Sequence, residues 1–297
     1  MKKVLVLKTK KVNPADSLVV ELSKFCDKDF LIDFASLHQD IVFKFVNGAE
    51  IFVNGKNILE YDLVYFRSWF GHYKIATAVS KYLIDNGIPV IDSALQNISL
   101  GGVTKIYQFL VLVQNNFPVP KSYVLHRDNI KNFLDEAVDA LGGYPLIIKK
   151  HDGHKGEGIH KVDSESEFYE ILPNLEDNYY FLQEFIPNDF DYRVLIMGNK
   201  VVRLKKRIRP ENSTDFRNNV ALGAKVELED PKKNETVSNL GLKASKLLQI
   251  DIAGVDIVIS SKDNKLYIFE VNTNPSLNND ITQYKDLANY LKSVVNN

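Results

Sequence analysis

Cysteine is almost absent from this 297-residue chain, in which Cys26 stands alone. One cysteine cannot form a disulfide within the chain, so a disulfide-stapled scaffold is excluded and a reducing, cytoplasmic setting is expected. Long apolar runs are missing too. The opening MKKVLVLKTK returns to lysine after four apolar residues, too few for a signal-peptide core, and no stretch approaches the roughly 18 apolar residues of a membrane helix. Sequence repeats and low-complexity tracts are also lacking, which excludes solenoid, collagen-like and disordered proteins.

An excess of charge of either sign is lacking as well. Lys and Arg total 37 against 38 Asp and Glu, a net charge of −1. No global positive field would recruit nucleic acid or an anionic membrane, so neither is expected as a partner. Hydrophobic residues, in contrast, make up 45% of the chain, which is ample for the cores of two or three domains.

The spacing of apolar residues predicts a mixed α/β (α+β) fold. Residues 104–115 are a strong helix candidate, Asp128 is expected to cap a helix over 128–141, and Pro187 marks a hinge. Three consecutive units are expected: an N-terminal α/β unit (1–97), a central unit with a glycine-rich loop (98–187) and a C-terminal unit with strands, a helix and a hairpin (188–297).

The predicted C-terminal hairpin, AGVDIVISSKDNKLYIFEVNTNP, carries the most specific signal. Strand residues two apart share a face, so Glu270 and Asn272 project together. If the turn occupies residues 261–265, Asp256 lies opposite Glu270. Two carboxylates and an amide oxygen on one patch suit Mg²⁺ or Mn²⁺ rather than zinc. The alternative is a solvated polar sheet edge, but the apolar neighbours of each acid favour a metal site.

A second pattern joins Lys149, at the end of an apolar strand, to the glycine-rich loop that follows it. Gly153, Gly156 and Gly158 would let backbone N–H groups approach an anion closely, and the lysine supplies a positive charge for phosphate oxygens. The loop is neither a Walker loop nor a dinucleotide fingerprint. The alternative is a solvent-exposed flap without a ligand.

Three histidines, His151, His154 and His160, lie in or beside the same loop. Three histidines are able to hold zinc. No cysteine or acidic ligand set accompanies them, so zinc is not favoured.

A third pattern is the basic strand RLKKRIRP. Strand alternation places Arg203, Lys205, Arg207 and Arg209 on one face, and Arg217 follows in the segment FRNN. A one-sided basic strand attracts an anionic ligand, but charge on a solvated edge strand is also common. Nucleic acid is disfavoured by the near-zero net charge.

A fourth pattern, Gln183-Glu184-Phe185-Ile186, ends a strand before Pro187. Backbone groups at such an exit are able to read an adenine edge, although many strands without a ligand end in the same way.

The order of these patterns resembles the ATP-grasp superfamily and, within it, the RimK-type carboxylate–amine (amino acid) ligases. The resemblance rests on Lys105 at a helix start, KKHDGHKGEG, QEFI, DYRV, KKR, FRNN and AGVD with FEVN, spans about residues 62–297 and is strongest from 145 onward. It implies an N-terminal preATP-grasp domain, a central domain and a C-terminal ATP-grasp domain, with ATP between the last two.

The resemblance also implies a role for each matched residue. The nucleotide would be bound by Lys105, Lys149, the flap glycines Gly156 and Gly158, Glu184 and Phe185 at the adenine, Asp191 at the ribose, and Asn219. The transferring phosphate would contact the catalytic Arg207 and Arg217, and Mg²⁺ would be held by Asp256, Glu270 and Asn272.

The activity implied is amide formation. The γ-phosphoryl group of ATP activates a carboxylate substrate as an acyl phosphate, and an amine, such as that of an amino acid (glutamate is one candidate), then attacks it. Because acyl phosphates hydrolyse, a closing flap is expected, and residues 153–158 are its candidate. The carboxylate could belong to a small molecule, a peptide or a protein, and a homo-oligomer is one of the assemblies that the resemblance allows.

The chain departs from the family in three places. The flap carries Lys155 and Glu157, and the loop after the metal ligands carries Asn274 and Ser276, where relatives have smaller or polar residues. Residues 1–61 match no motif. The segment Arg67–Phe70 either binds the carboxylate substrate or forms a buried aromatic contact with Arg67 exposed.

Three other functions stay open at this point. One is a peptide-modifying macrocyclase with a peptide-binding surface in residues 1–100. Another is an ATP-binding protein without turnover, which the intact metal ligands disfavour. The third is a kinase-like enzyme that stops at a phosphate ester.

Overall fold

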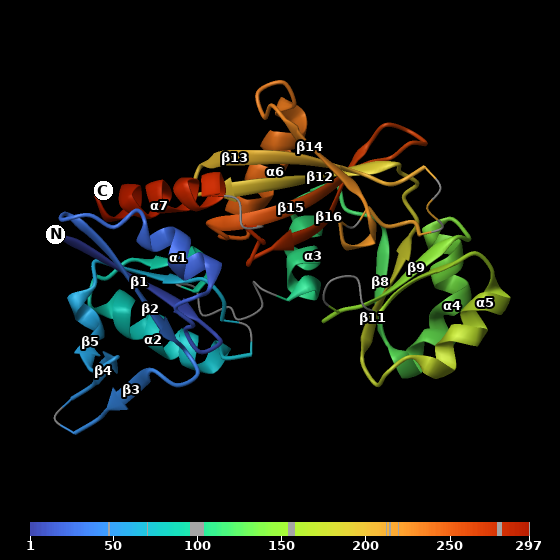
Figure 1. Cartoon of the computed structure of the whole chain (residues 1–297). Helices are drawn as coiled ribbons and strands as arrows, with labels where there is room; N and C mark the ends of the chain where they lie inside the picture. Colours follow the sequence, from blue (N-terminus) through green and yellow to red (C-terminus); the bar gives the residue numbers. More distant parts are fainter. Residues whose placement is uncertain are drawn as a thin grey trace.

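The computed structural model describes residues 1–296 except 47, 70, 96–103, 154–157, 212, 214, 219 and 278–280, and at residue 221 the backbone alone. Four β-sheets organise this part of the chain. In Figure 1 the C-terminal sheet runs across the molecule, with the N-terminal unit below one end and the central antiparallel sheet below the other.

The N-terminal sheet is parallel, with strand order β2-β1-β6-β7. Residues Val4 to Leu7 are completely buried because helices cover both faces of the sheet. Val4 and Val6 pack in the cluster that includes helices α1 and α7, and Leu5 and Leu7 pack in the cluster of α2. The elements are β1 (Lys2–Lys8), α1 (Ser17–Ser23), β2 (Phe30–Ser36), β6 (Leu63–Phe66), α2 (Tyr73–Asp85), β7 (Val90–Ile91) and, from the C-terminus, α7 (Ile281–Val295).

A small antiparallel sheet is inserted between β2 and β6. It consists of β3 (Ile41–Lys44), β4 (Glu50–Val53) and β5 (Lys56–Asn57), and the 3₁₀ turns of this half are η1 (Ile58–Glu60) and η2 (Ser93–Leu95).

The central sheet is antiparallel, in the order β10-β9-β11-β8. Leu146 and Ile148 of β9 pack under α4 and α5, so the alternate residue Lys149 faces the other side. The elements are β8 (Ser122–His126), α4 (Arg127–Leu141), β9 (Leu146–Lys150), β10 (Ile159–Val162), α5 (Glu165–Ile171), η4 (Leu172–Asn174) and β11 (Tyr179–Glu184).

The predicted cap of α4 is wrong by two residues. His126 is the N-cap, and its Nδ1 accepts a hydrogen bond from the backbone N–H of Asp128 at 3.4 Å. Asp128 lies in the first turn, where its negative charge still favours the helix N-terminus.

The C-terminal sheet is antiparallel, in the order β14-β13-β12-β15-β16. Helices α6 and α3 cover one face, where a Cβ added at Gly241 would lie 3.1 Å from Val194. Glycine is therefore what lets α6 approach the sheet closely. The elements are α3 (Lys105–Gln114), β12 (Phe190–Met197), β13 (Lys200–Ile208), η5 (Val220–Leu222), β14 (Lys225–Glu229), α6 (Glu235–Leu247), β15 (Ile252–Ile259) and β16 (Leu266–Asn272).

One apolar cluster joins the N-terminal unit to the C-terminal sheet. Leu195 and Met197 of β12 share it with β1, β2, α1 and α7. At its margin, Asp92 accepts a hydrogen bond from Ile252 N at 3.1 Å, and Asp251 accepts one from Ser93 N at 2.6 Å. Each acid thus caps the backbone of the other segment, which holds the two units in a defined orientation.

Among the described residues, no helix has both the length and the apolar composition needed to cross a membrane.

Candidate active site

Asp256 and Glu270 are directly opposed on β15 and β16, so the predicted pairing is confirmed. The predicted turn is wrong, because the strands leave residues 260–265 between them rather than 261–265. A bulge beside Asp256 leaves Phe269 as the extra residue of β16, and this offsets the longer turn. The two acids therefore occupy directly opposed positions of the hairpin.

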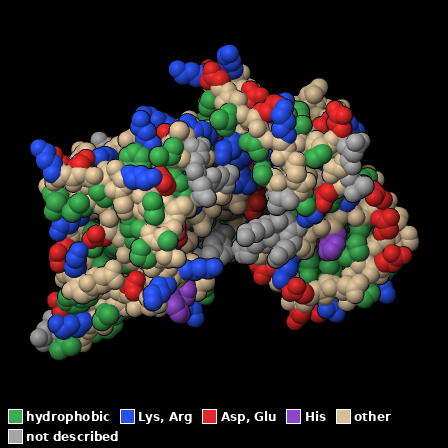
Figure 2. All heavy atoms as spheres, viewed as in Figure 1, with side chains coloured by type: hydrophobic (Ala, Val, Ile, Leu, Met, Phe, Trp, Pro, Cys, Tyr) green, Lys and Arg blue, Asp and Glu red, His purple; other side chains and the backbone are tan. Residues whose placement is uncertain are grey.

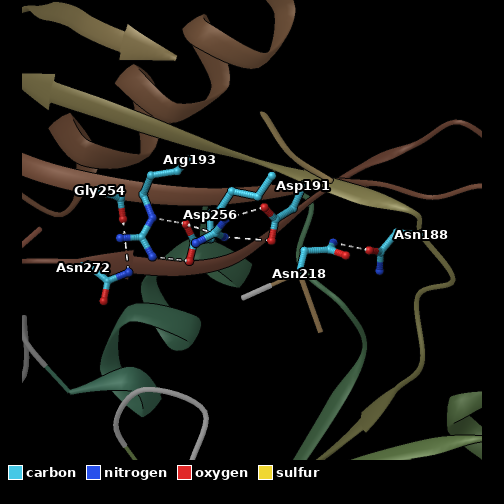
Figure 3. Close-up of polar contacts among 8 residues, drawn as sticks. Asn188, Asp191, Arg193, Asn218, Gly254, Asp256 and Asn272 are labelled. Atoms are coloured by element: carbon cyan, nitrogen blue, oxygen red, sulfur yellow. Dashed lines mark hydrogen bonds and ion pairs between the residues drawn. The ribbon is translucent and has the colours of Figure 1, made fainter. Parts of the chain in front are cut away.

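Protein cations surround this acidic pair. Arg193 donates to both carboxylate oxygens of Asp256, through Nε and, at 2.8 Å, through Nη2 (Figure 3). Arg207 Nη2 lies 3.1 Å from the same carboxylate, and Lys105 Nζ lies 3.3 Å from Glu270. Burial by itself would raise the pKa of Asp256, but the two guanidinium groups outweigh it and hold this pKa below its usual range. The repulsion expected between the two acids is thus offset by side chains of the chain itself.

Arg207 also forms a bidentate ion pair with Asp191, with N–O distances of 2.6 and 2.7 Å. The two residues are directly opposed on β13 and β12. Burial raises the pKa of Asp191 to about 6 in spite of the arginine. The same basic strand holds Arg203, whose guanidinium lies 2.9 Å from Asp286. The basic face of β13 is therefore built into ion pairs rather than left as a solvated edge.

Lys149 lies in a nearly dry position, with 8% of its surface exposed. Its Nζ is 5.9 Å from the ring centre of Phe109 in α3 and 5.6 Å from that of Phe181, the residue opposite it on β11. Burial lowers the pKa of Lys149 to about 8, although the charge of Glu270 opposes this shift. A buried cation close to an acidic pair is a strong candidate for a ligand-binding group.

Lys105 links the acidic pair to the glycine-rich loop. It begins helix α3 after the cap residue Thr104, and its Nζ donates to the carbonyl oxygen of Gly153 at 2.5 Å. The adjacent cavity is lined by Lys105, Phe109 and Glu270 among others. Gly158 closes the loop at φ +67°, with a Cβ position 3.1 Å from Lys150, so a side chain would be strained there.

Part of the predicted loop lies outside the described residues, namely Gly156, His154, Lys155 and Glu157, and the three-histidine zinc hypothesis remains a prediction for this reason. In the described part of the chain, one His/Asp group has ligand atoms close enough for a metal: His126, Asp128 and Asp177. His126 Nδ1 accepts from the backbone N–H of Asp128, and its Nε2 lies 3.0 Å from the Asp177 carboxylate, so the two nitrogens already have separate partners within the chain.

The predicted adenine segment has a clear structural partner. Glu184 ends β11, and its carboxylate accepts a hydrogen bond from the backbone N–H of Lys121 at 2.7 Å. The ring of Phe185 lies edge-on to that of Phe216, with 6.2 Å between ring centres, and Lys161 Nζ is 5.1 Å above the Phe185 ring.

The second predicted catalytic arginine is placed differently from the first. Arg217 pairs with Asp215 at 2.6 Å, two residues back along its own loop. The next residue, Asn218, is buried and donates to the Asn188 side chain at 2.6 Å (Figure 3). Asn219 lies outside the described residues.

Sequence reasoning missed Arg193. It lies two residues after Asp191 in DYRV, and so on the same face of β12, and it is directly opposed to Asp256. The alternation of the strand was the available signal. On this face of the C-terminal sheet, charged residues of neighbouring strands lie directly opposite one another. Figure 2 shows lysine and arginine side chains gathered at the upper wall of the hollow between the N-terminal and central units.

This arrangement of sheets is the mixed α/β ATP-grasp fold. The chain superimposes on the ATP-grasp ligase PsnB, solved with a minimal precursor, Mg and ADP, with a TM-score of 0.72 and 17% identity over 99% of this chain and 97% of that one. The chain belongs to the RimK-like ATP-grasp domain family, whose model matches residues 103–293.

Two relatives support the family assignment. The chain is 29% identical over 287 residues to the tetrahydromethanopterin:alpha-L-glutamate ligase of Methanocaldococcus jannaschii, covering 88% of each protein. It is 27% identical over 253 residues to a probable alpha-L-glutamate ligase of Vibrio vulnificus strain YJ016, covering 83% of this chain and 79% of that one. The chain is thus an enzyme of the ATP-grasp ligases, which form carbon–nitrogen bonds.

Proposed function

We propose that this protein is an ATP- and Mg²⁺-dependent carboxylate–amine ligase that forms an amide through an acyl phosphate. One observation carries the proposal: Asp256 and Glu270 meet on a sheet face ringed by Arg193, Arg207 and Lys105, beside the buried Lys149. Such a face suits a polyphosphate. Phosphoryl transfer is catalysed mainly by positioned charge, and these side chains supply charges of both signs.

The triphosphate is assigned to Lys149 and Lys105. Lys149 is held between aromatic rings and is therefore positioned before ligand arrives, and Lys105 already contacts the loop at Gly153. The adenine is assigned to the backbone beside Glu184 and Phe185, where β11 ends. Gly158 and the preceding loop, Gly156 included, would close over the phosphates and keep water from the acyl phosphate.

The resemblance assigned Asp191 to the ribose, but its carboxylate is held by Arg207. We therefore give Asp191 a positioning role as well: it holds the Arg207 guanidinium in one plane toward the reacting phosphate. Arg217 would turn from Asp215 to the same phosphate, with Asn219 beside it.

The metal is assigned to Asp256, Glu270 and Asn272. The donor set fits, since carboxylate and amide oxygens are what Mg²⁺ and Mn²⁺ prefer, and the Asn272 amide uses its nitrogen, at 3.4 Å, on the Gly254 carbonyl (Figure 3). Arg193 has to share Asp256 for a cation to bind. A metal held by these residues would neutralise part of the negative charge of the phosphates.

The reaction then proceeds in two steps, transfer of the phosphoryl group and attack of the amine. A carboxylate oxygen of the substrate attacks the γ-phosphorus and the bond to the bridging oxygen of ADP breaks. The amine attacks the acyl carbon, phosphate leaves with the bonding pair, and the amine loses a proton to solvent. Arg207 and Lys149 stabilise the charge that spreads over the phosphoryl oxygens.

The amine substrate is an amino acid, with glutamate favoured by the names of both relatives. A carboxylate on a peptide, a protein or a small molecule is the acyl substrate, and a peptide is favoured by the precursor bound to PsnB. A macrocyclase that joins side chains of one peptide is the second candidate, since PsnB is an ATP-grasp ligase that has also been solved with a precursor peptide. The reaction would take place in the cytoplasm.

The test is release of ADP and phosphate from Mg²⁺-ATP with a panel of amino acids and short acidic peptides, with hydroxylamine as a trap. A hydroxamate together with an amide product establishes the ligase. A product heavier by one phosphate, without hydroxamate, would replace it by a kinase, and loss of one water within a peptide would identify the macrocyclase.

A further inference from the structure

Arg67 differs from the other six arginines of the chain. Arg127, Arg193, Arg203, Arg207, Arg209 and Arg217 each have a carboxylate oxygen within 4.0 Å. Among the described residues, Arg67 forms no ion pair of that length, although it is partly buried and contacts a second unit through Pro275. Its positive charge therefore lacks the acidic partner within 4.0 Å that the other six arginines have among the described residues.

The position of Arg67 in the N-terminal sheet is one where ligands bind. It follows the carboxyl end of β6, next to the end of β1, and β1 lies between β2 and β6 in the sheet. In parallel sheets of this kind ligands bind at the carboxyl ends of the strands where the strand order reverses. The two strand ends are joined by a hydrogen bond from Thr9 N to the Ser68 hydroxyl at 3.1 Å. The alternative prediction for residues 67–70 is a buried aromatic contact with Arg67 exposed. Trp69 is buried, with 5% of its surface exposed, but Arg67 is partly buried rather than exposed.

The guanidinium of Arg67 points from this sheet toward the candidate active site. Its Nη2 donates to the carbonyl oxygen of Pro275 at 2.8 Å, three residues beyond the metal-ligand candidate Asn272. Pro275 and Arg193 both crowd Gly254, where an added Cβ would lie 3.0 Å from Pro275 Cβ and 3.2 Å from Arg193 Cδ. Pro275, which Arg67 contacts, and Arg193, which pairs with Asp256, therefore both lie beside Gly254.

The other nitrogen, Nη1, is buried and has no hydrogen-bond partner of ordinary geometry within the described residues. A buried charged donor without an acceptor is strongly unfavourable. The nearby acids do not provide one. Asp16 is paired with Lys8. Burial raises the pKa of Asp92 well above its usual range, although the charge of Arg67 opposes this shift, and no ion pair joins the two side chains. The Tyr65 hydroxyl, whose pKa burial raises to about 12, interacts with the Arg67 side chain but offers a neutral oxygen rather than the negative charge of a carboxylate.

We propose that Arg67 binds a carboxylate of one of the two organic substrates, with Nη1 as the donor and Nη2 fixed by Pro275. The inference rests on the proposed ligase function and specifies the substrate class: the molecule carries a free carboxylate in addition to its reacting group. A guanidinium with one nitrogen held and the other buried without a partner matches the planar geometry of a carboxylate. The carboxylate belongs either to the amino acid or to the acyl substrate.

The experiment measures binding without turnover, by calorimetry of the full chain with saturating Mg²⁺ and the non-hydrolysable analogue AMPPNP. L-Glutamate is compared with glutamine and isoglutamine, which lack the side-chain and the α-carboxylate respectively. N-Acetylglutamate and its two amides form a parallel series without a nucleophilic amine. In the wild-type protein one amide should bind roughly tenfold to a hundredfold more weakly than its parent, the range for a hydrogen bond to a charged group.

In R67Q this preference should fall to within about twofold, because the carboxylate no longer has a charged partner. R127Q is the matched control, since Arg127 also donates one nitrogen to a carbonyl, that of Leu175 at 2.8 Å, but in the central unit. It should keep the wild-type preference. A collapse confined to the glutamate series assigns Arg67 to the amino acid, and one confined to the acetylated series assigns it to the acyl substrate.

An unchanged preference in R67Q overturns the proposal, and so does wild-type protein that binds neither series or shows no carboxylate preference. If melting shows that R67Q is unfolded, R67K replaces it. Lysine keeps the charge but lacks the planar fork whose two nitrogens point to Pro275 and to the ligand, so the preference should still fall, and a wild-type value overturns the proposal. The ligase function fails separately, by the absence of hydroxamate.

Discussion

Arg193 holds both carboxylate oxygens of Asp256, the acid that we propose as a metal ligand. The same carboxylate cannot saturate a guanidinium and a divalent cation at once, so the two compete. Arg193 thereby offsets the charge of the buried Asp256 opposite Glu270, and a metal bound to Asp256 would leave more of the Arg193 side chain available to substrate.

Replacing Arg193 with Gln should therefore strengthen metal binding while it weakens catalysis. We expect Mn²⁺ affinity, measured by electron paramagnetic resonance without nucleotide, to rise roughly tenfold, which corresponds to about 1.4 kcal/mol. Arg203→Gln on the neighbouring strand is the control, because Arg203 pairs with Asp286 instead. Equal Mn²⁺ affinity in wild type and R193Q would show that the pair does not compete with the metal.

Glu270→Gln should reduce turnover by orders of magnitude and leave the fold intact. The amide keeps the shape of the side chain but removes the charge that opposes Asp256 across the hairpin. Steady-state ADP release and a thermal melt of the same sample test this. Wild-type activity in E270Q would remove Glu270 from the metal site.

Lys149 should make nucleotide binding sensitive to pH. Its pKa is about 8, so the fraction carrying a positive charge falls as pH rises from 7 to 9, and AMPPNP affinity measured without added metal should fall with it. Lys149→Arg keeps its charge over this range and should give a flatter profile. A wild-type profile with the same slope as K149R would place the pH dependence elsewhere.

Gly254 of β15 and Gly241 of α6 are a matched pair, because each lets another group approach the C-terminal sheet closely, from opposite faces. An added methyl meets Pro275 and Arg193 at Gly254, at 3.0 and 3.2 Å, and meets Val194 at Gly241, at 3.1 Å. Both Ala variants should lose about 1–3 kcal/mol of stability through overpacking. Only G254A should also lose activity, because only that methyl displaces Arg193. Similar activity losses in two folded variants would contradict this reading of the site.

Asp92 should lower stability more as pH rises. Burial raises its pKa in the folded protein well above the ordinary 3.8. Between the pKa of the unfolded chain and that of the folded protein, the folded state binds more protons than the unfolded state. The free energy of unfolding therefore falls as pH increases through this range. Asp92→Asn retains an oxygen for the backbone N–H of Ile252 and carries no charge. Its melting temperature relative to wild type should therefore increase between pH 4 and pH 7, and a constant difference would show that Asp92 does not titrate in this way.

The sequence predicted the local elements well because their patterns are local. The apolar residues within 104–115 predicted the helix that the structure gives as Lys105–Gln114, and the alternation of Glu270 and Asn272 placed both on one face of a strand. The strands β10 and β14 were not predicted. Neither has a continuous apolar pattern, and each is a strand because a neighbouring strand, β9 or β13, offers its edge.

The pairing of Asp256 with Glu270 shows how a correct prediction depended on two errors that cancelled. The turn is one residue longer than predicted, and the bulge at Phe269 restores the register. Turn length and bulge position depend on how the two strands pack on α6, which the alternation of a single strand does not contain.

The sequence by itself determined which chemical groups the site has: Lys149, Arg207 and the acids of β15 and β16 stand at positions whose side-chain direction follows from strand alternation. Only the tertiary structure decided what each group touches. Arg193 binds Asp256 across a sheet, Lys149 lies between Phe109 and Phe181, and Arg67 reaches Pro275 from another unit. Charge and burial act through space, so partners 60 or 200 residues apart in the chain are fixed by packing and not by spacing.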